Sequence, residues 1–208
     1  MAKRPFADLV VAVPKGRVLK ALAARFERAG VSSKQLLSDD RRLVRVDPTT
    51  GMTFLLVKPD DVPTYVEYGA ADLGIAGRDV LLEREYDLYA PLDLGVGVCR
   101  MVVAGPAEAR PVREPLRVAT KYPQVASRHF LAQGLNVELI YVQGSVELAP
   151  ITGLADVIVD LVESGETLRQ NGLVVKEHVA DVSSVVVVNR ARMKLKRSAI
   201  AAFLNVLR

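Results

Sequence analysis

Short apolar segments alternate with amphipathic helical segments along nearly the whole chain, and glycines and prolines separate them. Residues 9–13 form an apolar, strand-like run, and residues 18–29 carry apolar side chains at helical spacing before Gly30. The same pairing returns at residues 117–120 and 125–133. A strand followed by a helix is the repeating unit of α/β proteins with largely parallel sheets. The sequence therefore predicts an α/β fold.

A chain of 208 residues can form one large domain or two small lobes, and an internal similarity favours two. Residues 69–72 (Gly-Ala-Ala-Asp) resemble residues 153–156 (Gly-Leu-Ala-Asp). In both segments a turn glycine and an acid precede an apolar strand. Two interpretations stay open. A true repeat would give two similar lobes with a ligand cleft between them, whereas unrelated βα units can also share four letters by chance.

The C-terminal segment supplies the excess of positive charge. The formal net charge is +4, and residues 190–208 contain six basic side chains and no acidic one. Such a segment could bind nucleic acid or an acidic partner. Its apolar residues fall at helical spacing, however, which favours an amphipathic helix packed on the protein with a solvated or subunit-facing basic side. With no tryptophan and only 5% aromatic residues, an aromatic surface for single-stranded nucleic acid is not expected.

The counts of cysteine and histidine exclude further classes of protein. A single cysteine allows no internal disulfide, which is typical of a reducing compartment, and two histidines cannot make a His-rich zinc site. The N-terminal segment is a poor signal peptide because its apolar stretch is short and contains Asp8. No apolar run approaches the roughly 18 residues that a membrane-spanning helix needs. We therefore expect a cytoplasmic protein without a membrane or nucleic-acid partner.

The segment most informative about chemistry follows the apolar strand 157–160. The strand ends in Asp160, and a turn containing Ser164 and Gly165 then opens a helix at Thr167. Free N–H groups and the helix dipole attract phosphate at such a turn, and Asp160 could hold sugar hydroxyls or a magnesium ion. The alternative is a plain helix N-cap, because Ser and Thr often begin helices without binding anything.

A second candidate anion site lies between the first strand and the first helix. Lys15 and Arg17 flank Gly16 at the start of the helix, an arrangement that suits pyrophosphate. The alternative is a pair of solvated cations beside a turn. Three more cations lie near predicted strand ends, and each taken alone is most simply solvated: Arg41, Arg42 and Lys58.

Six motifs occur in a specific joint order along the chain. They are residues 13–17 (Val-Pro-Lys-Gly-Arg), 60–63 (Asp-Asp-Val-Pro), 71–77 (Ala-Asp-Leu-Gly-Ile-Ala-Gly), 119–123 (Ala-Thr-Lys-Tyr-Pro), 144–147 (Gly-Ser-Val-Glu) and 153–168. In this order they resemble the ATP phosphoribosyltransferase family in its short form, and the resemblance covers essentially the whole chain.

The resemblance implies an enzyme of the pentosyltransferase class that catalyses the first step of histidine biosynthesis. It would condense ATP with 5-phosphoribosyl-1-pyrophosphate (PRPP) and release pyrophosphate, with Mg²⁺ as cofactor. The implied fold is that of the two-lobed periplasmic binding proteins (type II), with a cleft between lobes joined by crossover strands near residues 94–103 and 183–188. Lobe I would comprise residues 1–102 and 182–208, and lobe II, residues 103–181.

The length implies the catalytic lobes without the C-terminal regulatory domain of long-form relatives. The family resemblance then implies a homodimer that assembles with a regulatory subunit similar to histidyl-tRNA synthetase.

The resemblance also assigns candidate site residues. Those implied for PRPP are Asp156, Asp160, Ser164, Gly165, Glu166, Thr167 and Leu168. Those implied for ATP or pyrophosphate are Lys15, Gly16, Arg17, Arg42, Lys58 and Glu147. The displacement at ribose C1 needs no dedicated nucleophile, so positioned charges should carry catalysis, with Asp160, Lys15 and Arg17 favoured for transition-state stabilisation. Glu166 is expected to point outward, because an acid would repel a bound phosphate.

Two other functions remain to be distinguished. One is a two-lobed module that binds a small anion without catalysis, against which the missing export signal counts. The other is a nucleobase phosphoribosyltransferase of the salvage type. Those enzymes carry two adjacent acids before the phosphate loop, whereas Val159 precedes Asp160 here.

Overall fold

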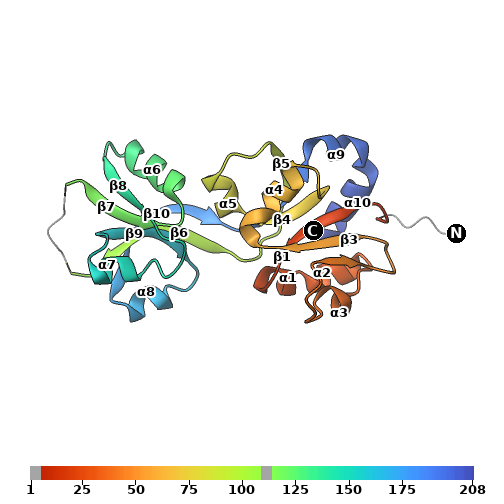
Figure 1. Ribbon diagram of the computed structural model, residues 1–208, viewed down its shortest axis with the longest axis horizontal. Coiled ribbons are helices and arrows are strands. Elements are labelled where there is room, and N and C mark those ends of the chain that lie inside the picture. Colours follow the sequence, from red (N-terminus) through yellow and green to blue (C-terminus); the bar gives the residue numbers. More distant parts are fainter. Residues whose placement is uncertain (1–5, 109–113) are drawn as a thin grey trace. The chain divides into compact units, whose positions relative to one another are not determined.

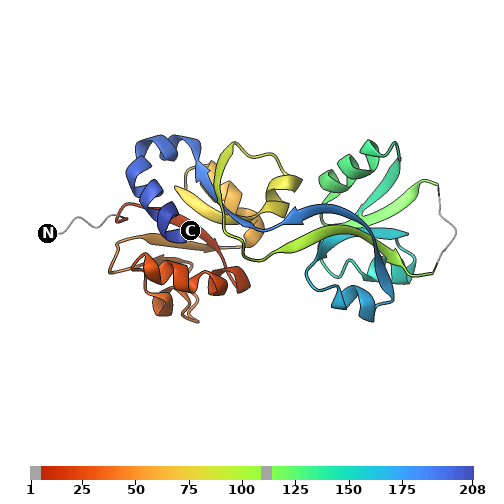
Figure 2. The same cartoon turned by 180° about the vertical axis from the view of Figure 1, so that it is seen from behind.

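The computed structural model describes residues 6–108 and 114–208. The chain forms two compact units, each containing one sheet (Figures 1 and 2). Unit 1 comprises the chain up to Leu81 together with Glu85–Gly97 and Ser183–Arg208, and unit 2 comprises Leu82–Arg84 and Val98–Val182. The chain thus leaves unit 1 after Gly97 and returns after Val182, whereas the sequence placed these two boundaries after residues 102 and 181.

The sheet of unit 1 has six strands in the order β2-β3-β1-β4-β11-β5. Strand β1 is central and runs parallel to both β3 and β4, while the other pairs are antiparallel. The strands are β1 (Val10–Pro14), β2 (Val44–Val46), β3 (Thr53–Val57), β4 (Leu73–Gly77), β5 (Leu88–Asp93) and β11 (Ser184–Asn189).

Helices cover both faces of this sheet. Successive side chains of β1 point to opposite faces, and those of residues 11–14 are buried. Val11 and Val13 pack in one cluster with Leu22 and Phe203, and Ala12 packs in another with Val62. The helices of unit 1 are α1 (Arg17–Ala21), α2 (Ala23–Arg28), α3 (Ser33–Leu36), the 3₁₀ turn η1 (Pro59–Asp61), α4 (Val62–Glu67), α5 (Arg78–Glu83), α9 (Arg190–Leu195) and α10 (Arg197–Leu207).

Unit 2 is a five-stranded sheet in the order β10-β6-β9-β7-β8, and β7 is parallel to both β8 and β9. Helix α6 covers one face, and α7 and α8 cover the other, as the two buried clusters show (Figure 1). The elements are β6 (Cys99–Pro106), β7 (Leu116–Thr120), α6 (Pro123–Ala132), β8 (Val137–Tyr141), α7 (Leu148–Thr152), β9 (Val157–Val162), α8 (Glu166–Gln170) and β10 (Leu173–Val182).

The expectation of largely parallel sheets was wrong. Strands β5 and β11 pair antiparallel in unit 1, and β6 pairs antiparallel with both β9 and β10 in unit 2. Apart from β9, these are the strands before and after the two points where the chain changes unit. An apolar run looks the same in the sequence whichever way its neighbour runs, so the pattern cannot reveal this direction. The prolines and charges of residues 105–115 predict a loop. The end of β6 occupies the first residues of this segment, and residues 109–113 lie outside the described residues.

The predicted C-terminal amphipathic helix is confirmed as two helices, α9 and α10, which meet at Lys196. Its apolar side chains, among them Ile200 and Phe203, lie in the core of unit 1. The basic side is not simply solvated, because Lys196 Nζ lies 2.8 Å from the Asp72 carboxylate and Arg192 Nε 3.3 Å from it. The excess charge of this segment therefore serves partly to attach it to unit 1.

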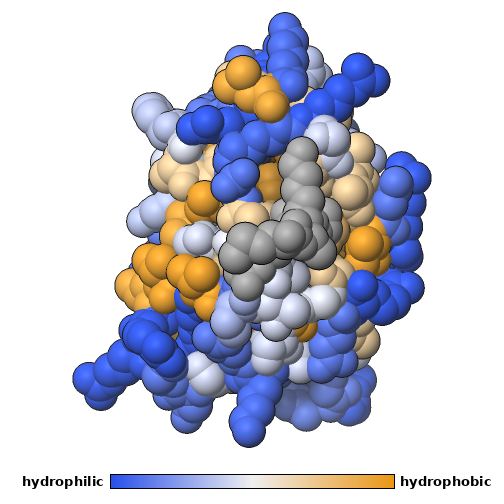
Figure 3. Space-filling model, turned by 90° about the vertical axis from the view of Figure 1, so that its right-hand side faces the viewer, coloured by the Kyte–Doolittle hydropathy of each residue, from blue (hydrophilic) through white to orange (hydrophobic). Residues whose placement is uncertain are grey.

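The surface gives no sign of a membrane span in the described residues. None of the helices in residues 6–108 and 114–208 is long and apolar enough to cross a bilayer. In the view of Figure 3 hydrophilic side chains predominate, and the hydrophobic ones form separate patches among them.

Candidate active site

In unit 2 the three parallel strands β7, β8 and β9 end at the same edge of the sheet. Thr120 is in register with Tyr141 of β8 and with Val159 of β9, so Lys121 and Asp160 follow at neighbouring strand positions. Thr120 is fully buried, and its hydroxyl donates to the Val159 carbonyl at 2.7 Å. The carboxyl edge of a parallel sheet is where α/β proteins bind ligands. The candidate site of unit 2 therefore lies at this edge.

The loop after β9 leads into α8 through Gly165, which has a φ of 78° and forms the N-cap. No side chain caps the helix at Gly165, and one local bond is present, from the Glu166 N–H to Ser164 Oγ at 3.3 Å. Ser164 and Thr167 are exposed, whereas the Leu168 side chain is buried in the core and could contribute only its main chain. The loop therefore offers backbone N–H groups and two hydroxyls to an anion.

Asp160 has the most perturbed carboxyl group of unit 2. Burial raises its pKa to about 6, and the negative charge of Glu147 acts in the same direction. The hydrogen bond from the Leu161 N–H and the positive charge of Lys121 oppose the rise. A half-buried carboxylate with so elevated a pKa is typical of a binding or catalytic group.

Glu147 and Lys121 complete the edge of unit 2. Glu147 lies in the loop after β8, at the N-cap of α7. Lys121 directly follows β7, and its ammonium lies 5.6 Å from the centre of the Tyr122 ring. The sequence placed Lys121 in a motif but gave it no role. Its position could have indicated a role, because Lys121 directly follows the end of a buried strand, as Lys15 follows Pro14.

Glu166 points along its own helix, as expected. Its carboxylate accepts hydrogen bonds from the Arg169 guanidinium at 2.7 Å and from the Gln170 amide at 2.7 Å. The neighbouring cation thus neutralises its charge, and the acid need not face a bound phosphate.

Asp156 lies at the start of β9, four residues before Asp160, so the strand separates it from the phosphate loop. Its carboxylate accepts the Arg117 N–H at 2.9 Å, and its own N–H donates to the Arg117 carbonyl at 2.9 Å. Asp72 makes the same pair of bonds with Val10 in unit 1, both at 2.8 Å. The two similar tetrapeptides of the sequence therefore share one local structure, which joins neighbouring strands and does not bring Asp156 to the loop.

We expect Asp156→Ala to reduce stability and to leave PRPP binding nearly intact. Removing the carboxylate leaves a partly buried N–H without its acceptor, at a cost of about 1–3 kcal/mol. Denaturant unfolding and the KM for PRPP, measured where the variant is folded, would separate the two effects. Asp72→Ala is the matched control in unit 1 and should cost more, because Lys196 also loses its partner. A KM raised more than about tenfold at unchanged stability would instead return Asp156 to the ribose site.

In unit 1 the predicted cations gather at one edge of the sheet. Pro14 is in register with Val57, so Lys15 and Lys58 follow at neighbouring strand ends, and the Lys15 N–H donates to the Val57 carbonyl at 3.3 Å. Strand β2 runs antiparallel to β3, which brings its first residues to this same edge, and Leu56 N–H donates to Leu43 O at 2.7 Å. We call this group the cationic edge: Lys15, Arg17, Arg42 and Lys58, all exposed.

Gly16 gives the cationic edge its backbone shape. Its φ of 102° and ψ of −140° are open only to glycine, and a Cβ at this position would meet no atom within 4 Å. No side chain caps α1 at Gly16, which repeats the arrangement at Gly165. The start of α1 thus lies between Lys15 and Arg17, with open space beside Gly16.

Arg42, a predicted phosphate ligand, is paired with an acid of its own loop. Its guanidinium lies 2.7 Å from the Asp40 carboxylate, and hydrogen bonds to Arg42 hold the pKa of Asp40 well below its usual range. An incoming phosphate would therefore have to share Arg42 with Asp40.

Comparison with known proteins identifies the family. The family model described as HisG, ATP phosphoribosyltransferase, matches residues 58–208. A protein of Sorangium cellulosum named ATP phosphoribosyltransferase is 54% identical over 200 residues, which are 96% of this chain and 94% of that protein. The chain belongs to the ATP phosphoribosyltransferase family. A relative of the same name from Citrifermentans bemidjiense is 48% identical over 202 residues, 95% of each protein.

Solved structures agree with the family and with the fold. The ATP phosphoribosyl transferase (HisG:HisZ) complex from Thermotoga maritima contains a chain with a TM-score of 0.84 and 36% identity, over 96% of this chain and 95% of that one. The alkanesulfonate-binding protein SsuA from Xanthomonas axonopodis pv. citri has a TM-score of 0.55 at 13% identity, over 97% of this chain and 72% of that one. The predicted periplasmic-binding-protein-like fold is confirmed.

Family membership decides between the functions that the sequence left open. The chain is an ATP phosphoribosyltransferase, a pentosyltransferase of histidine biosynthesis, which joins ATP to PRPP. The binding-module and salvage-enzyme alternatives are set aside on this ground. The resemblance seen in the sequence motifs is thereby confirmed.

Proposed function

We propose that the loop 163–168 of unit 2 binds the 5-phosphate of PRPP and that Asp160 binds its ribose hydroxyls. The observation that carries the proposal is the uncapped start of α8 at Gly165, with exposed hydroxyls on Ser164 and Thr167. The first N–H groups of a helix have no carbonyl partner within the helix, and such a helix start favours a dianionic phosphate. Glu147 lies near the same edge and affects the charge of Asp160.

We propose that the cationic edge of unit 1 binds the phosphates of ATP and of the departing pyrophosphate. In the reaction adenine N1 bonds to ribose C1 while the bond from C1 to the pyrophosphate oxygen breaks. Positive charge develops on the ribose and negative charge on the leaving group. Lys15 and Arg17 would stabilise the negative charge, and the Asp160 carboxylate would stabilise the positive charge through the ribose.

Mg²⁺ fits this donor set. It is usually bound through one or two carboxylates plus substrate phosphates, and Asp160 and Glu147 supply two carboxylates at one sheet edge. When bound, the ion would neutralise the charge that builds up on pyrophosphate. The protein's own contribution is to hold the ribose and the phosphates.

Removal of magnesium should abolish transfer. With the divalent ion chelated, we expect turnover to fall at least about 100-fold, because the pyrophosphate charge is no longer neutralised. Adding excess Mg²⁺ to the same sample is the control and should restore the rate. Turnover that persists in chelator would contradict the proposed role of the ion.

The partners and the compartment are also proposed. The T. maritima complex contains a HisZ component, and we propose that this chain forms a homodimer that assembles with an equivalent subunit similar to histidyl-tRNA synthetase. We place it in the cytoplasm, where ATP and PRPP are available. Spectrophotometric detection of phosphoribosyl-ATP, in fractions that co-purify from the native extract and in the isolated chain, tests the function and the assembly together. No product in any fraction would contradict both.

A further inference from the structure

Arg45 occupies an unexpected position in the edge strand β2. Its side chain points into unit 1 and the residue is only 7% exposed, whereas its apolar neighbours Val44 and Val46 are 56% and 54% exposed. A one-residue change of register would bury both valines and release the charge. The observed register therefore gives up apolar burial in order to place a guanidinium inside.

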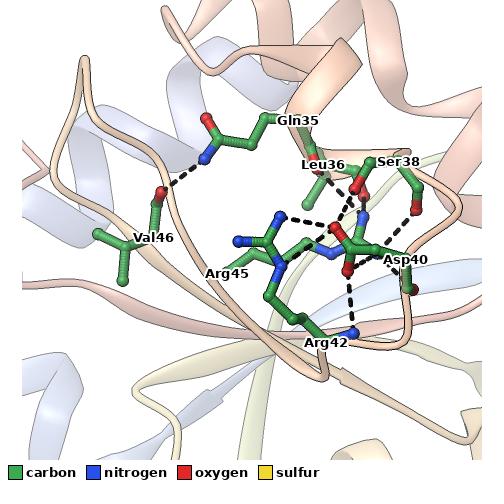
Figure 4. Close-up of polar contacts among 7 residues, drawn as sticks. All are labelled: Gln35, Leu36, Ser38, Asp40, Arg42, Arg45 and Val46. Atoms are coloured by element: carbon green, nitrogen blue, oxygen red, sulfur yellow. Dashed lines mark hydrogen bonds and ion pairs between the residues drawn. The ribbon is translucent and has the colours of Figure 1, made fainter.

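The guanidinium of Arg45 donates hydrogen bonds to backbone carbonyl groups around the end of α3 (Figure 4). Nη1 donates to the carbonyls of Gln35, at 3.1 Å, and Leu36. Nη2 donates to those of Ser38, at 2.7 Å, and Asp40, at 3.3 Å. The last carbonyls of a helix have no partner within the helix. One buried side chain thus holds the backbone from Gln35 to Asp40.

Asp40 in turn forms hydrogen bonds with Arg42. Its Oδ1 accepts the Arg42 N–H at 2.9 Å, and its Oδ2 accepts Arg42 Nε at 3.1 Å and Ser38 Oγ at 2.8 Å. Arg45 Nη2 also lies 3.4 Å from Asp40 Oδ1. The main chain is therefore fixed on both sides of Arg41. We call residues 37–42 the arginine loop.

The arginine loop gains its order from this network and hardly from apolar burial. Leu37 is 38% exposed, and the other loop residues are polar or charged and mostly exposed. Burying a charge seldom adds net stability, and Arg45 Nε is buried without a hydrogen-bond partner among the described residues. The bonds of Nη1 and Nη2 nevertheless hold the loop in one conformation. What the fixed conformation presents is a pair of arginines at the sheet edge where Lys15 and Lys58 lie.

We propose that Arg45 is a positioning residue: by holding the carbonyls of the arginine loop it keeps Arg42 of the cationic edge, and its neighbour Arg41, in place to receive pyrophosphate or the ATP phosphates. The inference rests on the proposed function of that edge. Arg45 itself is buried and touches no substrate in this role.

Limited trypsin digestion tests the anchoring without any need for turnover. In Arg45→Met we expect cleavage after Arg41 and Arg42, followed by mass spectrometry, to be about tenfold faster than in the wild type, because proteolysis follows the population of the open loop. Arg45→Lys should be intermediate, because one ammonium cannot span four carbonyls. Phe203→Leu controls for general destabilisation of unit 1, and Arg28→Met for loss of an exposed charge. Equal cleavage in Arg45→Met and Phe203→Leu would overturn the proposal.

Anion binding tests the positioning. We expect inorganic pyrophosphate, titrated calorimetrically, to bind about tenfold more weakly to Arg45→Met than to the wild type or to Arg28→Met. In the transfer assay the KM should rise about tenfold for ATP and also for PRPP, because the cationic edge receives phosphates of both substrates. Unchanged pyrophosphate affinity in a folded variant with a loosened loop would overturn the positioning role. A wild type that binds pyrophosphate but transfers nothing would contradict the proposed function and not this inference.

Discussion

Asp160→Asn should lower the rate of phosphoribosyl transfer about 100- to 1,000-fold, the magnitude observed when one group that stabilises transition-state charge is removed. The amide can still accept a hydrogen bond from the Leu161 N–H, so the loop should keep its shape. It cannot offer negative charge to the ribose as positive charge develops there. The loss should therefore appear in kcat as well as in the KM for PRPP.

The same substitution should stabilise the fold near neutral pH. Burial raises the pKa of Asp160 to about 6, so the ionised carboxylate is destabilising above that pH, by up to about 3 kcal/mol. Because the folded-state pKa is raised, the favourable contribution of this group is complete below the unfolded value near 4 and is lost as pH rises through 6. The increase in the free energy of unfolding caused by Asp160→Asn should therefore disappear at acid pH. Denaturant unfolding at several pH values would show this.

The pH dependence of activity should run the opposite way. Transfer needs the carboxylate, so kcat/KM for PRPP should fall as pH drops through about 6, the pKa of the free enzyme. Glu138→Gln, an exposed acid-to-amide change on β8, is the control and should leave rate and stability nearly unchanged. An Asp160→Asn variant with wild-type turnover, or one less stable at neutral pH, would remove Asp160 from the site.

The sequence predicted best the features that depend on local patterns. Buried strands such as β1, β7 and β9 lie within two residues of their predicted bounds, because an apolar run between turn residues is a short-range signal. The phosphate loop was found for the same reason, since Asp160, Gly165 and Thr167 are close along the chain. Helices α3 and α7, of four and five residues, are too short to show a helical period and were not predicted.

The features that the sequence could not predict depend on partners far away in the chain. The Asp156 carboxylate accepts a hydrogen bond from the N–H of Arg117, which is 39 positions away, and not from the loop. No local sequence pattern predicts that bond. Arg42 and Arg45 both look like surface cations, although one is exposed and the other is buried. The register of β2 against β3 decides which side chains of β2 face the core. The sequence does not determine this register, because valine and arginine alternate along β2.

Gly165→Val should raise the KM for PRPP about 100-fold with little loss of folded protein. A β-branched residue at a φ of 78° is strained by about 1–2 kcal/mol, and the loop can relieve this strain only by changing its backbone conformation. The Cβ itself would fit, since its nearest contact is Val162 at 3.8 Å. The fold should therefore survive while the N–H groups before α8 lose their common direction toward the phosphate.

Gly172→Val is the matched control for this strain. Gly172 lies just beyond the other end of α8 with a φ of 69°, and a Cβ there would meet nothing within 4 Å. It should show a similar loss of stability with an unchanged KM for PRPP. Within the loop, Thr167→Ala should raise the KM about tenfold, through loss of one hydroxyl bond to a charged group, and Glu166→Gln should change it less than about twofold. If Gly165→Val and Gly172→Val affect the KM alike, the loop is a structural cap and the phosphate of PRPP binds elsewhere.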